Sequence, residues 1–375
     1  MNDERELLRA TVEDLLAKNC TAERVAAAPR DGWDAALWEA LEDTGLTLAG
    51  SPEDAGGSGG DLTAAADIAV AAGAAAAPVP LAETLAAGML LAWAGAEIPP
   101  GPLTLAVASG RDVPLRRVPY GRLATTVAVG SGGTGRAPGS GRAGTAHGSG
   151  RAGTAAGSGP DGDWLAVIAR PGLVTPGRNL AGEPRDEVGP GPGAEVREAP
   201  PGTADYARRL LRLFRSLLIA GAAQRALDLT VAYVNEREQF GRALARFPTV
   251  QQEIARMAGE VALIGAATQA AVAAEEAAAG QDAGGAGVLS AVLAAKAQAS
   301  DNAGTVAAIA HQLHGAIGTT EEHRLRLTTT RLWSWRDEDG TAAECFAELG
   351  RAALGAAGRY QGGSLWPWLT GDPGP

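Results

Sequence analysis

The stretch that decides the fold is Glu236-Arg237-Glu238-Gln239-Phe240-Gly241-Arg242, together with a second one, Gln312-Leu313-His314-Gly315-Ala316-Ile317-Gly318. Both lie within residues 204–351, where long segments carry apolar residues at steps of three and four. Such spacing places side chains on one face of a helix. The segment before the first stretch shows it with Leu210, Phe214, Leu217, Leu218, Gly221 and Ala222. We therefore predict a long helix with a buried stripe.

Three more helices are predicted downstream. One opens with Pro248, which suits a first helical turn, and carries apolar residues as far as Ile264. Another runs from Val288 towards Gln312, and the last starts after Gly340. Four long helices with short connections favour an antiparallel bundle.

Composition limits the classes of function. With 32 Lys and Arg against 43 Asp and Glu, the net charge is −11, which disfavours a broad surface for nucleic acid or anionic membrane. The two cysteines, Cys20 and Cys345, have neither metal-site nor disulfide spacing, as is typical of a reducing compartment. The acidic start and the interrupted apolar region 64–96 do not resemble a signal peptide or a membrane span. We expect a soluble, cytoplasmic protein.

The chain before residue 204 is predicted to form two smaller units. Helical stripes occupy the first hundred residues, including helices at 64–76 and 80–94, the first of them capped by Asp61. Short runs rich in Val, Leu and Thr at 103–108, 123–129 and 164–168 indicate strands.

A segment rich in Gly, Ser, Arg and Ala interrupts these strands at 130–160. It repeats a nine-residue unit, Gly139-Ser-Gly-Arg-Ala-Gly-Thr-Ala-His147, and is predicted to be a flexible loop because it buries little apolar surface. The fold class is thus α+β, mainly α. Its predicted parts are a helical domain (1–102), a small β domain (103–200), a four-helix bundle (201–360) and a tail (361–375).

The order and separation of these motifs resemble the acyl-CoA dehydrogenase family. The resemblance is carried by Gly221-Ala-Ala-Gln-Arg-Ala-Leu-Asp228, by the Arg237 to Arg242 segment, by Phe247-Pro-Thr-Val-Gln-Gln252 and by His311-Gln-Leu-His-Gly-Ala-Ile-Gly318. It implies the family's three-part fold. It also implies FAD-dependent α,β-desaturation of an acyl thioester, in which a carboxylate removes the α proton and the β hydrogen leaves as hydride.

The β region departs from the family pattern. The usual Thr-Glu-Pro-like segment ending in Gly-Ser-Asp, and the Lys-x-Trp-Ile-Thr segment, are absent. The remaining segments, Pro119-Tyr-Gly-Arg-Leu-Ala124 and Gly177-Arg-Asn-Leu-Ala-Gly-Glu-Pro-Arg185, resemble divergent actinobacterial members, some of which form half of a heteromeric enzyme. The resemblance therefore leaves an alternative open, a non-catalytic partner subunit that supplies FAD-binding residues and an interface.

Asp339 is the candidate catalytic base. In most of the family the base is a Glu in a Tyr-Glu-Gly-Thr loop before the last helix, and aligning Gly340-Thr341 on that Gly-Thr puts Asp339 at the base position. In another branch the base comes from the helix around Leu211 and Arg212, where this chain has no carboxylate. Glu338 is the adjacent substitute. A plain alternative is that an acidic residue before Gly-Thr caps the helix or is simply solvated.

The resemblance also assigns residues to FAD. Arg237 corresponds to an arginine that contacts the FAD pyrophosphate of a neighbouring subunit, and a guanidinium group suits phosphate. Phe240 is expected beside the adenine or flavin. The remaining predicted contacts are Gln312, Gly315, Ala316 and Thr341. Helix salt bridges with Glu236 and Glu238 are the alternative for Arg237.

No metal site is expected. His311, His314 and His323 lack a consistent arrangement with Glu or Cys, and His314 is expected to be packed or hydrogen-bonded. Arg324, Arg326 and Arg331 are expected to face solvent, a subunit interface or a phosphate.

The expected partners follow from the resemblance. They are an acyl-CoA or acyl-carrier thioester and an electron-transfer flavoprotein or other electron acceptor. The expected assembly is a homo-oligomer or a heterotetramer with a second acyl-CoA dehydrogenase subunit. We expect neither nucleic acid nor membrane as a partner.

Overall fold

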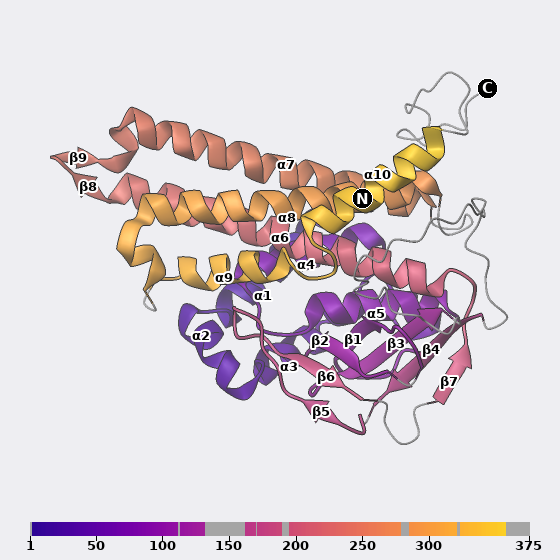
Figure 1. Cartoon of the computed structure of the whole chain (residues 1–375). Helices are drawn as coiled ribbons and strands as arrows, with labels where there is room; N and C mark the ends of the chain where they lie inside the picture. Colours follow the sequence, from indigo (N-terminus) through magenta and orange to yellow (C-terminus); the bar gives the residue numbers. More distant parts are fainter. Residues whose placement is uncertain are drawn as a thin grey trace, which may run out of the picture.

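A computed structural model of the chain describes residues 2–111, 113–131, 162–169, 171–189, 195–278, 285–320 and 323–357. The long C-terminal helices lie on one side of the molecule, and the two small sheets lie on the other beside several N-terminal helices (Figure 1). The α+β, mainly helical fold class is confirmed. The domain boundaries at residues 102, 200 and 360 stay proposals, and both the proposed tail and most of the 130–160 segment lie outside the described residues.

Five helices and two short 3₁₀ turns form the N-terminal part: α1 (Asn2–Asn19), α2 (Ala22–Asp31), α3 (Ala35–Asp43), η1 (Leu46–Leu48), η2 (Glu53–Ala55), α4 (Leu62–Ala75) and α5 (Leu81–Trp93). The expected helices at 64–76 and 80–94 are confirmed as α4 and α5. The Asp61 carboxylate accepts a hydrogen bond from the backbone N–H of Ala64 at 2.8 Å, so the predicted cap is also confirmed.

The strands form two sheets: β1 (Leu103–Val107), β3 (Thr125–Ser131), β4 (Asp163–Ile168) and β7 (Glu195–Glu198) in one, and β2 (Leu115–Pro119), β6 (Arg185–Val188) and β5 (Val174–Thr175) in the other. The three predicted strands are β1, β3 and β4. β1 pairs with β3 in parallel, whereas β3 pairs with β4 antiparallel from Thr126–Ile168 to Ser131–Asp163. Because the β3–β4 pairing is continuous, Ser131 and Asp163 lie side by side at one end of the pair.

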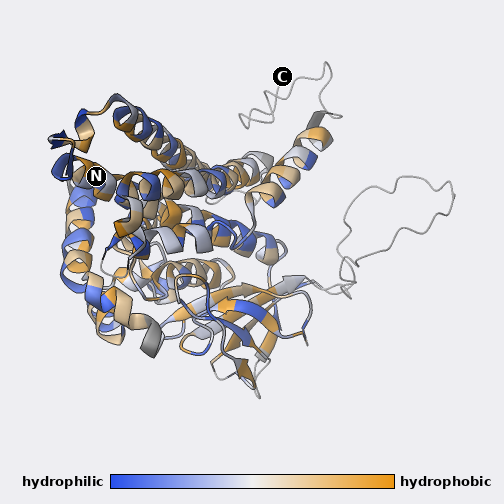
Figure 2. Ribbon diagram, turned by 60° about the vertical axis from the view of Figure 1, so that its left-hand side comes forward, coloured by the Kyte–Doolittle hydropathy of each residue, from blue (hydrophilic) through white to orange (hydrophobic). Residues whose placement is uncertain are grey.

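The C-terminal part contains α6 (Thr203–Glu236), the hairpin β8 (Glu238–Gln239) and β9 (Arg242–Ala243), η3 (Leu244–Arg246), α7 (Pro248–Ala278), α8 (Ala286–His314), η4 (Gly315–Thr319), α9 (Leu325–Trp335) and α10 (Ala342–Ala357). All four predicted helices are confirmed, as α6, α7, α8 and α10. The separate helix α9 was not predicted. Figure 2 shows both hydrophobic and hydrophilic stretches in the sheets, in keeping with apolar β1 and β3 and charged β6 and β7.

Helix α6 lies at the centre and packs against α4, α5, α7, α8 and α9. Glycine makes its crossing with α4 close. A Cβ on Gly221 would lie 1.9 Å from the carbonyl oxygen of Val70, and one on Gly73 would lie 2.2 Å from that of Leu218. By length and composition alone, α6 and α7 could cross a membrane. Both pack against neighbouring helices, with 50% of the apolar window of α6 and 33% of that of α7 buried.

Candidate active site

Asp339 lies in the loop between α9 and α10, where the backbone turns sharply. Its φ is +58°, and that of Gly340 is +109°. The cap of α10 is Thr341: its hydroxyl accepts a hydrogen bond from the N–H of Glu344 at 3.2 Å, and the Glu344 carboxylate accepts one from the N–H of Thr341 at 2.9 Å. This reciprocal pair is a capping box. The capping alternative for Asp339 is therefore wrong, because Thr341 performs that role.

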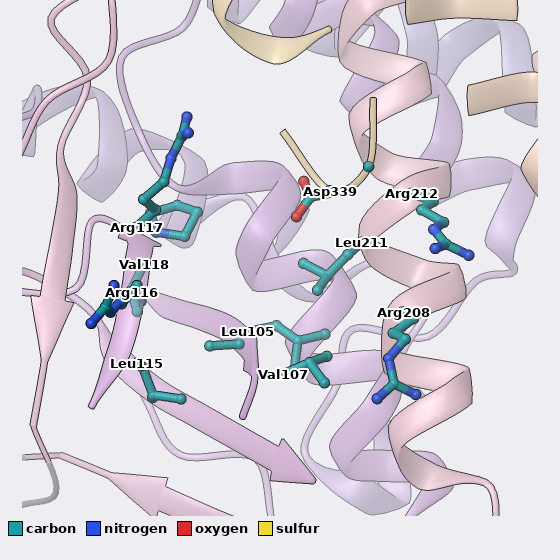
Figure 3. Close-up of a pocket in the computed structure, with 13 residues that line it drawn as sticks. Leu105, Val107, Leu115, Arg116, Arg117, Val118, Arg208, Leu211, Arg212 and Asp339 are labelled. Atoms are coloured by element: carbon teal, nitrogen blue, oxygen red, sulfur yellow. The ribbon is translucent and has the colours of Figure 1, made fainter. Parts of the chain in front are cut away.

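A pocket of about 270 Å³ opens beside Asp339, between the sheets and α6. Figure 3 shows Asp339 on the side of α6 and Arg117 on the side of β2. Apolar side chains line much of the pocket: Leu105, Val107, Leu115, Val118 and Leu211. The Asp339 side chain is 18% exposed, so it is neither buried nor freely solvated.

Arg215 of α6 holds the Asp339 carboxylate. Its Nε donates to Oδ2 at 2.8 Å. Within the residues that the structure describes, Oδ1 has no hydrogen-bond partner. The ion pair therefore orients the carboxylate through one oxygen and leaves the other available.

Behind Asp339 lies a buried network of charges. Glu338 forms a bidentate pair with Arg185, with N–O distances of 2.9 and 2.8 Å, and lies 3.3 Å from Arg215. Glu183 pairs with Arg331 at 3.0 Å and accepts a hydrogen bond from the indole N–H of Trp335 at 2.9 Å. The network joins the β domain to α6 and α9.

Opposing charges decide the protonation of this network. Burial opposes ionisation of Glu338, but Arg185 and Arg215 outweigh it and lower the pKa of Glu338 to about 2. Glu183 behaves alike: against the effect of burial, Arg331 and Arg185 lower its pKa. Burial raises the pKa of Glu83, a third carboxyl group that lies 3.3 Å from Arg215.

Two expectations are corrected by this network. Glu338 was the substitute base, but it is 7% exposed and does not line the pocket because two arginines hold it in the interior. Arg331 was expected to face solvent, an interface or a phosphate, yet it is 2% exposed and paired with Glu183.

Lys296 of α8 supports the loop from beneath. Its ammonium group is fully buried and donates to the carbonyl oxygens of Arg336 at 3.1 Å and Gly340 at 2.7 Å, and to the hydroxyl of Ser300. Burial lowers the pKa of Lys296 to about 8. The lysine therefore fixes both ends of the segment that carries Asp339.

The predicted FAD residues gather at the other end of the bundle, with one exception. Arg237 directly follows the last residue of α6, Phe240 is the 93% exposed tip of the hairpin, and Gln312 lies in the last turn of α8. Gly315 and Ala316 follow in η4. The ends of α6 and α8 are joined where Tyr233 stacks on His314 with ring centroids 4.3 Å apart.

Thr341 is the exception. The neighbouring residue Gly340 accepts a hydrogen bond from Lys296 of α8. Along the axis of α8, Lys296 and Gln312 are about 24 Å apart, because an α-helix rises 1.5 Å per residue. Thr341 and Gln312 therefore do not meet within one chain.

The exposed end of the bundle suits an anionic diphosphate. Within the described part of the chain, the Arg237 guanidinium has no partner, so the helix salt-bridge alternative is wrong. Gly315 has φ +63°, and a Cβ there would meet no atom within 4 Å, so its backbone is open to close approach. An unpaired guanidinium group and an accessible backbone are both common means of binding phosphate.

The histidines at this end are packed. His314 is 3% exposed, and its Nδ1 lies 2.8 Å from the carbonyl oxygen of Ala310. This confirms the expectation for His314. His311 stacks on Trp333 at 5.2 Å. Among the described residues, no three His, Cys, Asp or Glu side chains are arranged to hold a metal ion.

Two family models match the chain: the acyl-CoA dehydrogenase N-terminal domain at residues 2–98, and the C-terminal domain at residues 205–343. Acyl-CoA dehydrogenase IpdE2 of Mycobacterium tuberculosis is 31% identical over 336 residues, which cover 87% of this chain and 89% of the relative. The chain belongs to the acyl-CoA dehydrogenase family. Members of the family are FAD flavoproteins that oxidise a CH–CH bond of an acyl-CoA.

Solved structures share the fold of this acyl-CoA dehydrogenase. The Tcur3481-Tcur3483 steroid ACAD has a TM-score of 0.77 and 22% identity, covering 95% of this chain and 99% of that one. The ChsE4-ChsE5 complex from Mycobacterium tuberculosis has a TM-score of 0.75 and 21% identity, covering 92% and 96%.

Proposed function

We propose that this acyl-CoA dehydrogenase catalyses FAD-dependent α,β-desaturation of an acyl-CoA or carrier-bound acyl thioester, with Asp339 as the base. The observation that carries the proposal is the carboxylate of Asp339 at the side of a pocket that apolar side chains line in part, with one oxygen held by Arg215 and the other free among the described residues. A base needs this combination of fixed orientation and partial desolvation.

The reaction balances as follows. Asp339 Oδ1 takes the proton from the α carbon, the electron pair of that C–H bond forms the C=C bond, and the β hydrogen leaves with its electrons. When bound, FAD supplies the acceptor for that hydride. An electron-transfer flavoprotein or another acceptor then reoxidises the enzyme. Arg215 keeps the carboxylate in place, and the apolar side chains of Leu105, Val107 and Leu211 limit the access of water to the α carbon.

The FAD contacts are proposed across subunits. Arg237 and the Gly315 backbone hold the diphosphate, Gln312 and Ala316 contribute beside them, and Phe240 packs on the adenine or flavin. Because these residues are exposed at the far end of the bundle from Asp339, they serve a neighbour's cofactor. Thr341 remains a proposed contact to FAD beside Asp339. The enzyme is thus an oligomer, which we place in the cytoplasm without a nucleic-acid or membrane partner.

A second function, a non-catalytic partner subunit in a heterotetramer, is favoured by one further observation. The charged network fills the interior behind Asp339 and leaves a cavity of only about 10 Å³ among Glu83, Arg185 and Arg215. An acyl tail cannot extend into that space. The similar ChsE4-ChsE5 structure is a complex, which gives a precedent for assembly from different chains. In this case the chain contributes Arg237 and Gln312 to a companion's FAD.

Absorption spectra test both functions. The protein is purified alone and co-expressed with a second acyl-CoA dehydrogenase subunit, and acyl-CoA is added without oxygen. If acyl-CoA bleaches the flavin of the wild type but not that of Asp339→Asn, the assignment of Asp339 as the base is supported. The matched control is Asp337→Asn, an exposed neighbour paired only with Arg336 among the described residues. Bleaching of the co-expressed complex that survives Asp339→Asn refutes the base and supports the partner-subunit function.

A further inference from the structure

Strand β2 contains a bulge that presents two arginines beside the pocket. Leu115 pairs with Val188 and Val118 with Asp186, so two residues of β2, Arg116 and Arg117, stand opposite one residue of β6. A bulge of this kind redirects side chains. The φ of Arg117 is +56°, a left-handed conformation that disfavours a residue with a long side chain.

These two arginines differ from the others that line the pocket. Arg208 pairs with Asp205 at 2.6 Å, and Arg212 forms a bidentate pair with Glu348. Neither Arg116 nor Arg117 has a hydrogen-bond or ion-pair partner in the described ranges. The rim at β2 therefore carries uncompensated positive charge.

Of the two arginines, Arg117 is the better candidate to contact a ligand in the pocket. Figure 3 shows its side chain on the β2 side of the pocket, across from Asp339, whereas Arg116 leaves the strand in another direction. The apolar residues Leu115 and Val118 flank the bulge and line the same pocket. A strained backbone that persists beside a pocket points to a functional constraint.

We propose that Arg117, assisted by Arg116, is an anion subsite of this pocket, and that the ligand joins an apolar body to a negatively charged group. The proposal rests on the proposed function, because it names a feature of the same thioester substrate. The negative group is either a carboxylate at the far end of the acyl chain or a phosphate of the carrier. Both match the fixed donors of a guanidinium group.

Titration calorimetry on the full chain, purified with its partner where one is required, distinguishes these sources. The probes are butanoyl-N-acetylcysteamine, its 4-carboxybutanoyl counterpart and butanoyl-CoA. Only the second carries an acyl carboxylate, and only the third carries phosphate. We expect the wild type to bind a probe with the recognised anion about tenfold more tightly than butanoyl-N-acetylcysteamine, as one charge-assisted pair provides.

Arg117→Asn removes the charge while keeping a residue that tolerates positive φ, and Arg117→Gly does so without backbone strain. Both variants are expected to abolish the tenfold preference. Arg197→Gln is the matched control, an exposed arginine of β7 outside the pocket lining, and it should leave the preference unchanged. Loss for the carboxylated probe alone identifies an acyl carboxylate, and loss for butanoyl-CoA alone identifies a phosphate.

Equal binding of all three probes by the wild type overturns the subsite, as does unchanged binding in both Arg117 variants. Calorimetry requires no flavin reduction. A preserved anion preference without flavin bleaching would therefore refute the proposed function and leave the subsite intact. Flavin bleaching without an anion preference would refute the subsite and leave the proposed function intact.

Discussion

Replacing Lys296 by methionine should change how the stability of this protein depends on pH. Methionine keeps most of the volume of the buried side chain but removes its charge and its hydrogen bonds to Arg336 and Gly340. The charged groups that act most on this lysine are Asp339, Cys345, Arg215 and Glu338. Asp339, Cys345 and Glu338 raise the pKa of Lys296, but together they do not offset the loss of hydration, which lowers it.

The magnitude follows from the lysine pKa, which burial lowers from 10.5 to about 8. A folded-state pKa below the unfolded-state pKa means that protonation disfavours the folded state. This penalty is complete below the folded-state value and is lost as the pH rises towards the unfolded-state value. The wild type should therefore gain about 2 kcal/mol relative to Lys296→Met between about pH 7 and pH 9.5.

Urea unfolding of both proteins at the two pH values measures this gain. Other groups that titrate in the same range are present in both proteins and cancel in the difference. Lys18→Met is the control, since Lys18 is the other lysine in the sequence and is exposed on α1. A stability difference that stays constant, or that moves against the wild type as the pH rises, would refute the burial argument.

Three further outcomes are expected. Glu338→Gln should lower the free energy of unfolding by about 3–5 kcal/mol at neutral pH, because Arg185 and Arg215 stay buried and each loses one carboxylate partner. In the wild type this contribution should disappear as the pH falls from 4.5 towards 2. Gly221→Ala should destabilise by about 1–3 kcal/mol through its clash with Val70, whereas Gly350→Ala in α10, where a Cβ meets nothing within 4 Å, should stabilise slightly. Thr341→Ala should remove about 1 kcal/mol by deleting the α10 cap. Urea unfolding measures each free energy, and an unchanged midpoint would contradict the corresponding argument.

Local patterns were enough to predict most of the architecture. The apolar steps before Arg237 mark α6, and Pro248 marks the first residue of α7. The Val- and Leu-rich runs mark β1, β3 and β4. These signals depend on neighbours within one helical turn or one strand, which the sequence displays directly.

The charged interior was not predictable in the same way. Arg215 meets Glu83 and Asp339 across more than a hundred residues of chain, and no local period encodes such a pairing. One signal was present for Arg331: it lies three residues after Thr328 and four before Trp335, both of which are buried on α9. Lys296 had a similar signal, since it follows Val292 by one helical turn.

The residues of the candidate site also differ in whether the sequence alone could indicate them. The proposal of Asp339 as the base came from aligning Gly340-Thr341 on the family's Gly-Thr, whereas its partner Arg215 could be identified only from the fold. The position of Arg117 could not be predicted from the sequence. The bulge that places it depends on the register of β2 against β6 and on no feature of β2 alone.

The hairpin of β3 and β4 has an evolutionary consequence. Its pairing continues to Ser131 and Asp163, so the tandem nine-residue units are inserted where the chain would otherwise turn back on itself. Each doubling of an insertion at such a point adds only about 0.6 kcal/mol of closure entropy. Duplication or deletion of one unit by slippage of the coding DNA would therefore be nearly neutral for folding. Related genes should differ freely in repeat number here while keeping the strands on either side.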